Sequence, residues 1–329
     1  MDVMVIGLGS MGKRRIRLLK GFEQIRKIVG IDRSEDRRAE VNEKFHCKTY
    51  DSIENAMKEN EQIQCAFICS SPLSHNSLIA EALYRNLHVF TEINLISAGY
   101  EENMALAGNR EKVLFLSSTF CYREEIKFLN RRIKKRENLN YVYHIGQYLP
   151  DWHPWESYKD FFVSNKKTNG CREIMAIEFP WLIGTFGQVI NVNVMSDKIS
   201  ELNIPYKDNY MVQLEHERGN KGSLVIDIVS PMAVRNLEIY GENIYFSWNG
   251  TPTGLKEFDE EKREVRQVQL YDKIEHMAGY NSFIVENAYQ NEIQEFLDAV
   301  EGKKQPKYGF KEDLEVLKII DLIEGVNYE

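Results

Sequence analysis

Short apolar runs alternate with amphipathic stretches over the first 120 residues of the chain. The apolar runs have the length of buried strands and fall at residues 3–6, 28–31, 64–69, 88–91 and 113–117. Between them, apolar positions recur with helical spacing at residues 13–19, 34–45, 74–85 and 98–110. Regular alternation of strand and helix is typical of an α/β fold with a doubly wound parallel sheet.

The pattern changes after residue 120. Strand-like runs now follow one another with few helices between them, at residues 141–148, 190–195, 210–216, 222–229, 235–240 and 243–248. Helical spacing is found at residues 123–136, 174–186, 284–300 and 311–324. Gly219-Asn220-Lys221-Gly222 has the composition of a hairpin turn. The sequence therefore predicts a parallel-sheet domain over residues 1–120 and an α+β domain with a mostly antiparallel sheet over residues 121–329.

One motif lies between the first strand and the first helix: Gly7-Leu8-Gly9-Ser10-Met11-Gly12. We interpret Gly7 as allowing the tight turn, Gly9 as letting a pyrophosphate approach the backbone, and Gly12 as letting the helix pack on the strand. The N–H groups at the start of the helix, around Ser10 and Met11, would face the phosphates. The alternative is a merely glycine-rich turn, but the flanking strands and helix have the places that a dinucleotide site requires.

The cofactor preference depends on the end of the second strand. Asp32 lies there, twenty residues after Gly12, where an acid accepts hydrogen bonds from the ribose hydroxyls of an adenosine. Its charge would repel the 2′-phosphate of NADP, which favours NAD. Arg33 follows directly, and an arginine there would bind that phosphate or stack on adenine, so NADP stays open.

Composition and charge narrow the class of protein. Hydrophobic residues make up 43% of the chain and charged residues 28%, as in soluble globular proteins. A net charge of -8 argues against a nucleic-acid partner. The five cysteines show no metal-type spacing, so we expect no metal site and a reducing compartment. The first strand leaves no room for a signal peptide, and no apolar run approaches the ~20 residues of a membrane span. We therefore expect a cytoplasmic protein.

Further motifs carry a resemblance to a known family. They are Cys69-Ser70-Ser71-Pro72-Leu73-Ser74-His75, His88-Val89-Phe90-Thr91-Glu92, Arg235-Asn236-Leu237-Glu238-Ile239-Tyr240-Gly241 and Asn291-Glu292-Ile293-Gln294-Glu295-Phe296-Leu297. With the glycine motif, they resemble the family of glucose–fructose oxidoreductase, inositol dehydrogenase and MocA over essentially the whole chain. The resemblance implies a Rossmann domain followed by a domain with an open antiparallel sheet backed by helices. It also implies a nicotinamide cofactor, a small sugar-like substrate, and a homodimer or higher homo-oligomer formed through the second sheet.

The resemblance also assigns roles near the cofactor. The loop that contains Ser70, Ser71 and Pro72 would pass along the cofactor, with Pro72 shaping its turn. His75 would cap the next helix near the phosphates, which we favour over a role as an acid or base. Glu92 would lie near the nicotinamide ribose.

Three departures affect the proton-transfer groups. The family's Glu-Lys-Pro motif corresponds to Glu92-Ile93-Asn94, so isoleucine replaces the lysine that helps to polarise the reacting group. When the helical motif is aligned on Gly170, the family's aspartate and histidine fall on Ile174 and Ile177. A slip of one residue would bring Glu173 or Glu178 into play. The usual proton-transfer machinery is therefore in doubt.

Two stretches would supply a replacement. The loop after residue 146 holds the aromatic and polar side chains of Tyr148, Trp152, His153 and Trp155. We consider Tyr148 and His153 for proton transfer, and the two tryptophans for stacking on a sugar ring. The alternative is a structural loop whose tryptophans pack into the core, and we weigh the two interpretations equally.

The second stretch is the start of the helix at residues 174–186. Glu178 lies among apolar residues, and partial desolvation would raise its pKa towards a useful range for an acid or base. Arg172 would bind an anionic substrate, and Arg123 would face the substrate cleft or lie at a helix start on the surface. For Glu173 we favour a surface role at the helix start.

These observations lead to two hypotheses of different class. The first is an NAD(P)-dependent oxidoreductase of a sugar or sugar derivative, with an acidic or nucleotide-linked sugar of surface polysaccharide synthesis as the narrower expectation. Arg172 and Leu149-Pro150-Asp151-Trp152 motivate the narrower expectation. The second is a dinucleotide- or sugar-binding regulatory protein without redox chemistry. The intact glycine motif favours the enzyme.

Overall fold

The computed structural model describes residues 1–153, 156–275 and 283–326 of the chain, which divides into two compact units. The first unit contains Met1–Ser118 and Tyr289–Leu314, and the second contains Thr119–Ala288 and residues 315–326. The chain first passes from the first unit to the second after Ser118, two residues before the boundary expected at residue 120. The segment Tyr289–Leu314 was expected in the second domain but belongs to the first unit.

A six-stranded parallel sheet forms the core of the first unit. Its strands are β1 (Asp2–Ile6), β2 (Lys27–Ile31), β3 (Lys48–Tyr50), β4 (Ile63–Ile68), β5 (His88–Thr91) and β6 (Leu114–Leu116). They lie in the order β3-β2-β1-β4-β5-β6, with every neighbouring pair parallel. This is the strand order of dinucleotide-binding domains, so the predicted doubly wound sheet is confirmed.

Helices follow the strands of this unit. They are α1 (Ser10–Leu19), α2 (Glu35–Phe45), α3 (Ile53–Glu59), α4 (His75–Tyr84), α5 (Tyr100–Asn109) and most of α8 (Glu286–Val300). The four helices predicted between residues 13 and 110 are confirmed as α1, α2, α4 and α5. The Ser34 side chain caps α2 by accepting a hydrogen bond from the Arg37 N–H, and Ser52 caps α3 in the same way.

An aromatic cluster explains why most of α8 belongs to the first unit. Phe67, Phe90 and Phe115 are stacked across β4, β5 and β6, at centroid distances of 4.9 and 5.1 Å. Phe296 of α8 meets all three rings edge-on, at 5.2 to 5.7 Å. Each of these side chains is fully buried. Edge-on aromatic packing of this kind fixes a distant helix on the sheet.

The second unit is built on an eight-stranded sheet. Its strands are β7 (Asn140–Gly146), β8 (Val189–Asp197), β9 (Asn209–His216), β10 (Lys221–Asp227), β11 (Val234–Gly241), β12 (Ile244–Trp248), β13 (Lys256–Asp259) and β14 (Glu264–Gln267). Their order is β14-β13-β12-β11-β7-β10-β9-β8. Only β7 and β10 pair in parallel, so the predicted mostly antiparallel sheet is confirmed. The charged strand β13 and the edge strand β14 were not predicted.

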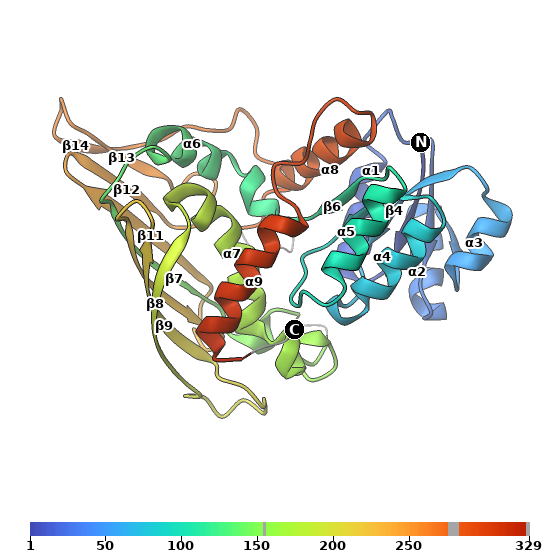
Figure 1. Cartoon of the computed structure of the whole chain (residues 1–329), viewed down its shortest axis with the longest axis horizontal. Coiled ribbons are helices and arrows are strands. Elements are labelled where there is room, and N and C mark those ends of the chain that lie inside the picture. The colour runs from blue at the N-terminus through green and yellow to red at the C-terminus, as the bar shows by residue number, and fades with distance from the viewer. Residues whose placement is uncertain (154–155, 276–282, 327–329) are drawn as a thin grey trace. The chain divides into compact units, whose positions relative to one another are not determined.

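Helices lie along one face of this sheet (Figure 1). They include α6 (Glu124–Ile133) and α7 (Gly170–Phe186), while α9 (Phe310–Glu324) is divided between the units. Short 3-10 turns occupy Pro72–Ser74, Thr119–Tyr122, Leu149–Asp151, Phe162–Ser164 and Lys166–Thr168. Along β9, Tyr210 and Val212 are buried while Met211 and Gln213 are exposed, so one sheet face is covered and the other is open.

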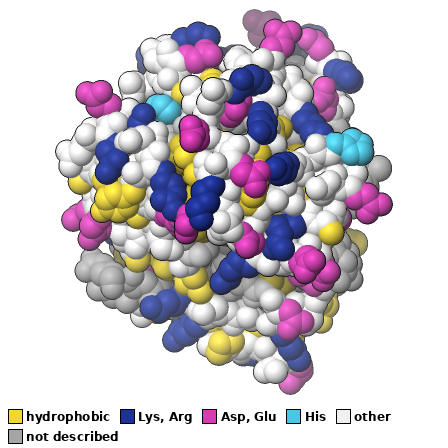
Figure 2. Space-filling view, turned by 90° about the vertical axis from the view of Figure 1, so that its right-hand side faces the viewer, with side chains coloured by type: hydrophobic (Ala, Val, Ile, Leu, Met, Phe, Trp, Pro, Cys, Tyr) yellow, Lys and Arg dark blue, Asp and Glu magenta, His cyan; other side chains and the backbone are white. Residues whose placement is uncertain are grey.

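The surface carries both kinds of charge, and the cysteines, all within the described residues, form no disulfide bond. Acidic and basic side chains are interspersed over the face shown in Figure 2. All five cysteines are free thiols. In the part of the chain that the structure describes, no helix is long and apolar enough to cross a membrane.

Candidate cofactor and substrate sites

The turn between β1 and α1 requires two of its three glycines for its own backbone. Gly7 has a φ of 91°, and a Cβ atom there would lie 2.7 Å from the Cys69 carbonyl oxygen. A Cβ atom on Gly12 would lie 1.9 Å from the Gly7 carbonyl oxygen. A Cβ atom on Gly9 would meet nothing within 4 Å. The fold therefore does not explain Gly9, whereas a ligand in that open space does.

The start of α1 suits an anion in the space beside Gly9. The helix has ten residues, begins at Ser10 and carries no acidic residue in its first turn. The N–H groups of its first turn, which include those of Ser10 and Met11, have no partner within the helix. These residues fit the pyrophosphate of a dinucleotide.

The Asp32 carboxylate is oriented by two backbone N–H groups. Leu8 of the glycine motif donates to Oδ2 at 2.8 Å, and Ser34 donates to Oδ1 at 2.9 Å. Each carboxylate oxygen keeps a further lone pair, which ribose hydroxyls would use. A direct hydrogen bond therefore joins the glycine turn to Asp32, the acid that the sequence analysis assigned to the same site.

Three arginines surround this acid. Arg33 and Arg37 are exposed, and the Arg37 guanidinium lies 3.8 Å from the Asp32 carboxylate. Arg38 donates to the carbonyl oxygens of Asp32 and Arg33. The exposed pair would accompany a 2′-phosphate, so the arrangement suits both NAD and NADP.

The loop after β4 is fixed by a buried histidine. His75 Nε2 lies 3.0 Å from the Ser70 carbonyl oxygen, and Nδ1 lies 2.5 Å from the side-chain amide of Asn94. Burial lowers the His75 pKa, which keeps the ring neutral. The hydrogen bonds of His75 therefore connect the loop after β4 with the loop after β5. Their partner in the second loop is Asn94, at the position where the family has proline. Ser71 and Pro72 lie in the same loop, at the start of a 3-10 turn.

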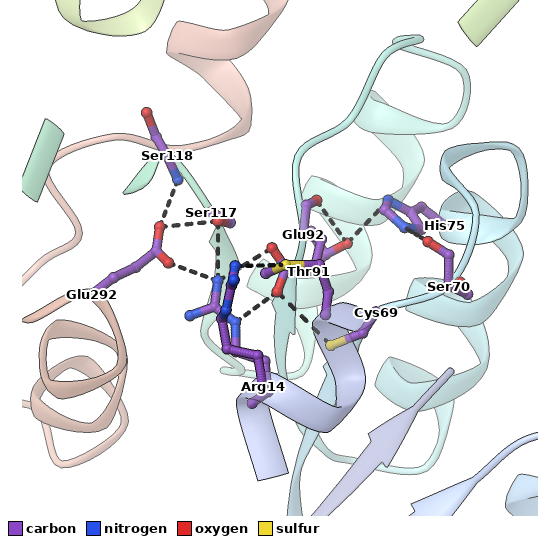
Figure 3. A network of polar contacts seen from close by, with 11 residues as sticks. Arg14, Cys69, Ser70, His75, Thr91, Glu92, Ser117, Ser118 and Glu292 are labelled. Carbon is purple, nitrogen blue, oxygen red and sulfur yellow. Dashed lines mark hydrogen bonds and ion pairs between the residues drawn. The ribbon is translucent and has the colours of Figure 1, made fainter. Parts of the chain in front are cut away.

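Behind this loop lies an ionic network that the sequence analysis missed. Arg15 Nε donates to Glu92 at 2.6 Å, and Arg15 Nη2 donates to Glu292 at 2.8 Å. Glu292 also accepts hydrogen bonds from the Ser117 hydroxyl and the Ser118 N–H (Figure 3). Arg15 follows the glycine motif, and Glu292 lies in the family-like motif Asn291–Leu297. No feature of the neighbouring sequence indicates that these two residues pair.

Burial governs the electrostatics of this network. Burial alone would lower the Arg15 pKa, but the neighbouring Glu92 and Glu292 carboxylates raise it above its ordinary value. Burial raises the Glu292 pKa, against the pull of Arg15. One arginine therefore neutralises two carboxylates in a dry site, and Glu92 is held by α1 at the end of β5.

Glu178, a proposed acid or base, is fully occupied. Its Oε2 accepts hydrogen bonds from the Tyr143 hydroxyl at 2.8 Å and the Trp181 indole at 2.7 Å. Its Oε1 accepts from Arg235 Nε at 2.9 Å. The side chain is completely buried. Protein donors already occupy both carboxylate oxygens, so this position supports a role in orienting Arg235 rather than in proton transfer.

Glu173 has the opposite surroundings. Its Oε2 is buried and makes no hydrogen bond to the described residues. Burial raises the pKa of Glu173 to about 8. The sequence analysis favoured a surface role for this residue, because it lies in the first turn of a helix. The structure instead gives α7 a carboxyl group that is protonated near neutral pH.

Both arginines considered for substrate binding are buried and bond to other groups of the protein. Arg172 is buried and lies 2.5 Å from the carboxylates of Asp321 and Glu324. Arg123 is also buried, and it bonds to Glu125 and to the Phe283 carbonyl oxygen. Neither position supports the expected contact with a substrate, because protein acceptors already surround both guanidinium groups.

The aromatic loop after β7 is partly ordered by its own contacts. The Trp152 indole donates to the Gln147 carbonyl oxygen at 3.1 Å. His153 Nδ1 lies 2.9 Å from the Glu156 carboxylate, and the His153 ring packs on Phe161. Tyr148 is half-buried. Trp155 lies outside the described residues. Within the described ranges, no three His, Cys, Asp or Glu side chains gather as metal ligands.

Comparison with known proteins adds to this geometry. Residues 1–116 match the model of the "Oxidoreductase family, NAD-binding Rossmann fold" (GFO_IDH_MocA). Mouse biliverdin reductase A is 27% identical over 245 residues, which cover 72% of this chain and 74% of that protein.

Two solved structures are similar over nearly all of both chains. UDP-N-acetylglucosamine 3-dehydrogenase GnnA from Acidithiobacillus ferrooxidans has a TM-score of 0.76 at 16% identity, with 99% of this chain and 97% of that chain covered. Biliverdin reductase from Synechocystis, solved with biliverdin and NADP⁺, has a TM-score of 0.73 at 16% identity, with 98% and 97% covered. At these identities the likeness shows the fold alone.

The glycine turn with its open space, the oriented Asp32 and the match over residues 1–116 agree with one another. The chain is therefore an NAD(P)-dependent oxidoreductase, and its first 116 residues match the glucose–fructose oxidoreductase, inositol dehydrogenase and MocA family.

Proposed function

We propose that this oxidoreductase acts on a sugar or sugar derivative. The observation that carries the proposal is the complete dinucleotide half: Gly9 leaves space that the fold does not need, and Asp32 is aligned by Leu8 and Ser34. The sugar-type substrate is supported by the family resemblance and by the similarity to the UDP-N-acetylglucosamine dehydrogenase fold.

The chain's own residues prepare the site for a nicotinamide cofactor, which supplies a hydride acceptor or donor when bound. The N–H groups of Ser10 and Met11 would bind the pyrophosphate, and the Asp32 carboxylate would accept from the adenosine ribose. Arg15 orients Glu92 at the end of β5. His75 and Asn94 hold the two loops that follow β4 and β5.

A proton must also move when an alcohol is oxidised or a carbonyl is reduced. We propose Glu173 for this step, because it combines a buried oxygen that has no partner among the described residues with a pKa of about 8. His153 and Tyr148 remain proposed alternatives in the loop after β7. Glu178 is proposed as a positioning residue.

A second candidate function follows from the curated relative. The 27% identity to mouse biliverdin reductase A favours reduction of a linear tetrapyrrole. Hydride addition to a conjugated carbon does not remove a hydroxyl proton, so the isoleucine at position 93 would be no obstacle. Absorbance of biliverdin with NADH or NADPH distinguishes this activity from sugar oxidation.

The first experiment is titration with NADH and NADPH, followed by tryptophan-to-nicotinamide energy transfer. We expect wild-type binding and loss of roughly tenfold or more in affinity in Gly9→Ala, whose added methyl fills the phosphate space. Gly108→Ala is the matched control, because its Cβ atom also meets nothing within 4 Å. Absence of binding to the wild type would contradict the enzyme and favour a non-redox role.

A panel of sugars and sugar derivatives with NAD then tests turnover. Substrate-dependent NADH formation is the expected result. Its rate in Glu173→Gln, His153→Ala and Tyr148→Phe assigns the proton-transfer group. If all three variants keep the wild-type rate and pH profile, the proposed roles are wrong.

We further propose that the open sheet face of the second unit pairs two copies of the chain. Met195 is 68% exposed, Met211 is 47% exposed, and the two lie opposite each other on β8 and β9. Such side chains are unfavourable in water. Light scattering should show a dimer that Met211→Lys weakens, while Met232→Lys, in an 80% exposed loop position, leaves it intact. A monomeric wild type would contradict this proposal.

A further inference from the structure

Arg235 of β11 is held at every point except the end of its guanidinium. Its Nε donates to the buried Glu178 carboxylate at 2.9 Å. Its stem lies against Gly250, where a Cβ atom would come within 2.6 Å of the Arg235 Cβ. The guanidinium carbon lies 4.7 Å from the centroid of the Phe120 ring and 5.6 Å from that of Phe283. Stacked rings and a fixed Nε restrict the side chain to one orientation.

The far edge of this guanidinium is unused by the protein. The structure shows no hydrogen bond within 3.5 Å from Nη1 or Nη2 to a described residue, although the neighbouring Tyr143 hydroxyl contributes to raising the Arg235 pKa. The side chain is 16% exposed. The nearby Tyr143 hydroxyl donates its own hydrogen to Glu178. Burial would lower the Arg235 pKa, but Glu178 raises it above the ordinary value, so the charge is permanent.

A planar pair of N–H groups in a fixed orientation matches the two oxygens of a carboxylate or a phosphate. The guanidinium also lies close to the apolar rings of Phe120 and Phe283, and apolar surroundings strengthen a charge-assisted hydrogen bond. Arg172 and Arg123, the other arginines considered for substrate, lack such an edge because protein acceptors surround them.

We propose that the terminal edge of Arg235, beside Phe120 and Phe283, is an oxyanion subsite, which binds a carboxylate or phosphate group of the substrate. This deepens the proposed function and rests on it, because it restricts the sugar-type substrate to one that carries an oxyanion. Glu178 acts through Arg235 by holding its Nε.

The test is residue-resolved labelling of the full chain with p-hydroxyphenylglyoxal, read by mass spectrometry. The reaction is run alone and with inorganic phosphate, D-glucuronate or D-glucose. We expect phosphate or glucuronate to slow the labelling of Arg235 several-fold, and glucose to leave it unchanged. Arg131, an exposed arginine of α6, is the internal control and should react equally in all four samples. Comparison of the phosphate and glucuronate samples identifies which oxyanion fits.

A second measurement is calorimetric titration of NADH-loaded protein with the better anion. Arg235→Lys keeps the positive charge but loses the paired N–H groups of the guanidinium. We therefore expect the affinity for the anion to fall roughly tenfold to a hundredfold. Arg131→Lys should bind as the wild type does. NADH affinity in Arg235→Lys should be unchanged, which shows that the variant is folded.

The proposal is overturned if Arg235 is unreactive, if neither anion protects it, if glucose protects it equally, or if Arg235→Lys keeps wild-type affinity for the anion. These outcomes are independent of the proposed function. A wild type that binds no NADH but shows anion protection contradicts the proposed function and leaves the subsite standing. NADH binding without protection contradicts only the subsite.

Discussion

The two units use buried arginines in different ways. In the first unit, Arg15 lies between Glu92 and Glu292 and faces two carboxylates with one positive charge. In the second unit, Arg235 pairs with one described carboxylate, that of Glu178, and its side chain is partly exposed. The first arrangement holds α1, β5 and α8 together. The second arrangement presents a group that a ligand would complete.

This comparison shows that burial of an arginine does not by itself identify a binding site. What matters is how many acceptors surround the guanidinium and whether a left-over donor can be reached from outside. Arg15 Nη1 also lacks a described partner, but it is buried, whereas the Arg235 side chain is partly exposed. Arg172, with two carboxylates around it, behaves like Arg15. Glu173 is the acidic counterpart of Arg235, because its Oε2 has no described partner.

The largest effect is expected from Arg15→Met. Two carboxylates would then remain buried without their cation, which should lower the free energy of unfolding by about 3–5 kcal/mol. Urea denaturation followed by circular dichroism measures the change. Lys48→Met removes one partner of the exposed Lys48–Glu59 pair and should leave the midpoint unchanged. A loss below about 1 kcal/mol in Arg15→Met would mean that the network is not a structural centre of the first unit.

The next effect concerns Glu173 and depends on pH. The Glu173 pKa is about 8 in the folded chain, against an ordinary value of 4.5. Between these values the folded state binds the proton more tightly, so stability falls as pH rises through this range. Glu173→Gln should remove this slope and make the protein roughly 2–4 kcal/mol more stable than the wild type above pH 8.

Urea midpoints at several pH values from 4 to 9 test this expectation. Glu201→Gln, at an exposed position, is the control and should retain the wild-type slope. Parallel wild-type and Glu173→Gln curves would show that Glu173 is ionised in the folded protein. Such a result would also remove it as the proposed proton-transfer group.

A smaller effect is expected from Glu178→Gln. The amide cannot accept from Tyr143, Trp181 and Arg235 together, because one of its two positions is itself a donor. The free energy of unfolding should fall by about 1–3 kcal/mol. Anion affinity should fall with it, while the pH profile of turnover keeps its shape. A changed profile would instead support Glu178 as an acid or base.

The smallest effect is expected from Asp32→Ser. Loss of the carboxylate should weaken NADH binding by roughly tenfold, since hydrogen bonds to a charged group contribute about 1.5 kcal/mol or more. NADPH should lose less affinity, because Arg33 and Arg37 remain beside the site. The ratio of the two dissociation constants from fluorescence titration is the readout. An equal loss for both cofactors would show that Asp32 does not select between them.

The sequence predicted most of the sheet-forming segments and the dinucleotide turn. The strand at His88–Thr91 was predicted at its observed bounds, and Gly219 adopts a positive φ of 73° in the expected hairpin. The short strand β3 and the charged strands β13 and β14 were missed, because few residues and no apolar alternation mark them. The surroundings of Glu173 and Glu178 differ from those expected, because helical position does not reveal which carboxylate finds donors.

The sequence by itself determined what depends on neighbouring residues. A φ of 91° at Gly7, the missing side chain at Gly9 and an acid at the end of the next strand are local requirements of a phosphate-binding turn. Tertiary structure alone decided the partners of the buried charges. Arg15 and Glu292 are 277 residues apart, and Glu178 and Arg235 are 57 apart. Such pairs form because a buried charge is costly unless it is paired with a group that the fold brings near. The distance between the two residues in the sequence does not reveal which groups will pair.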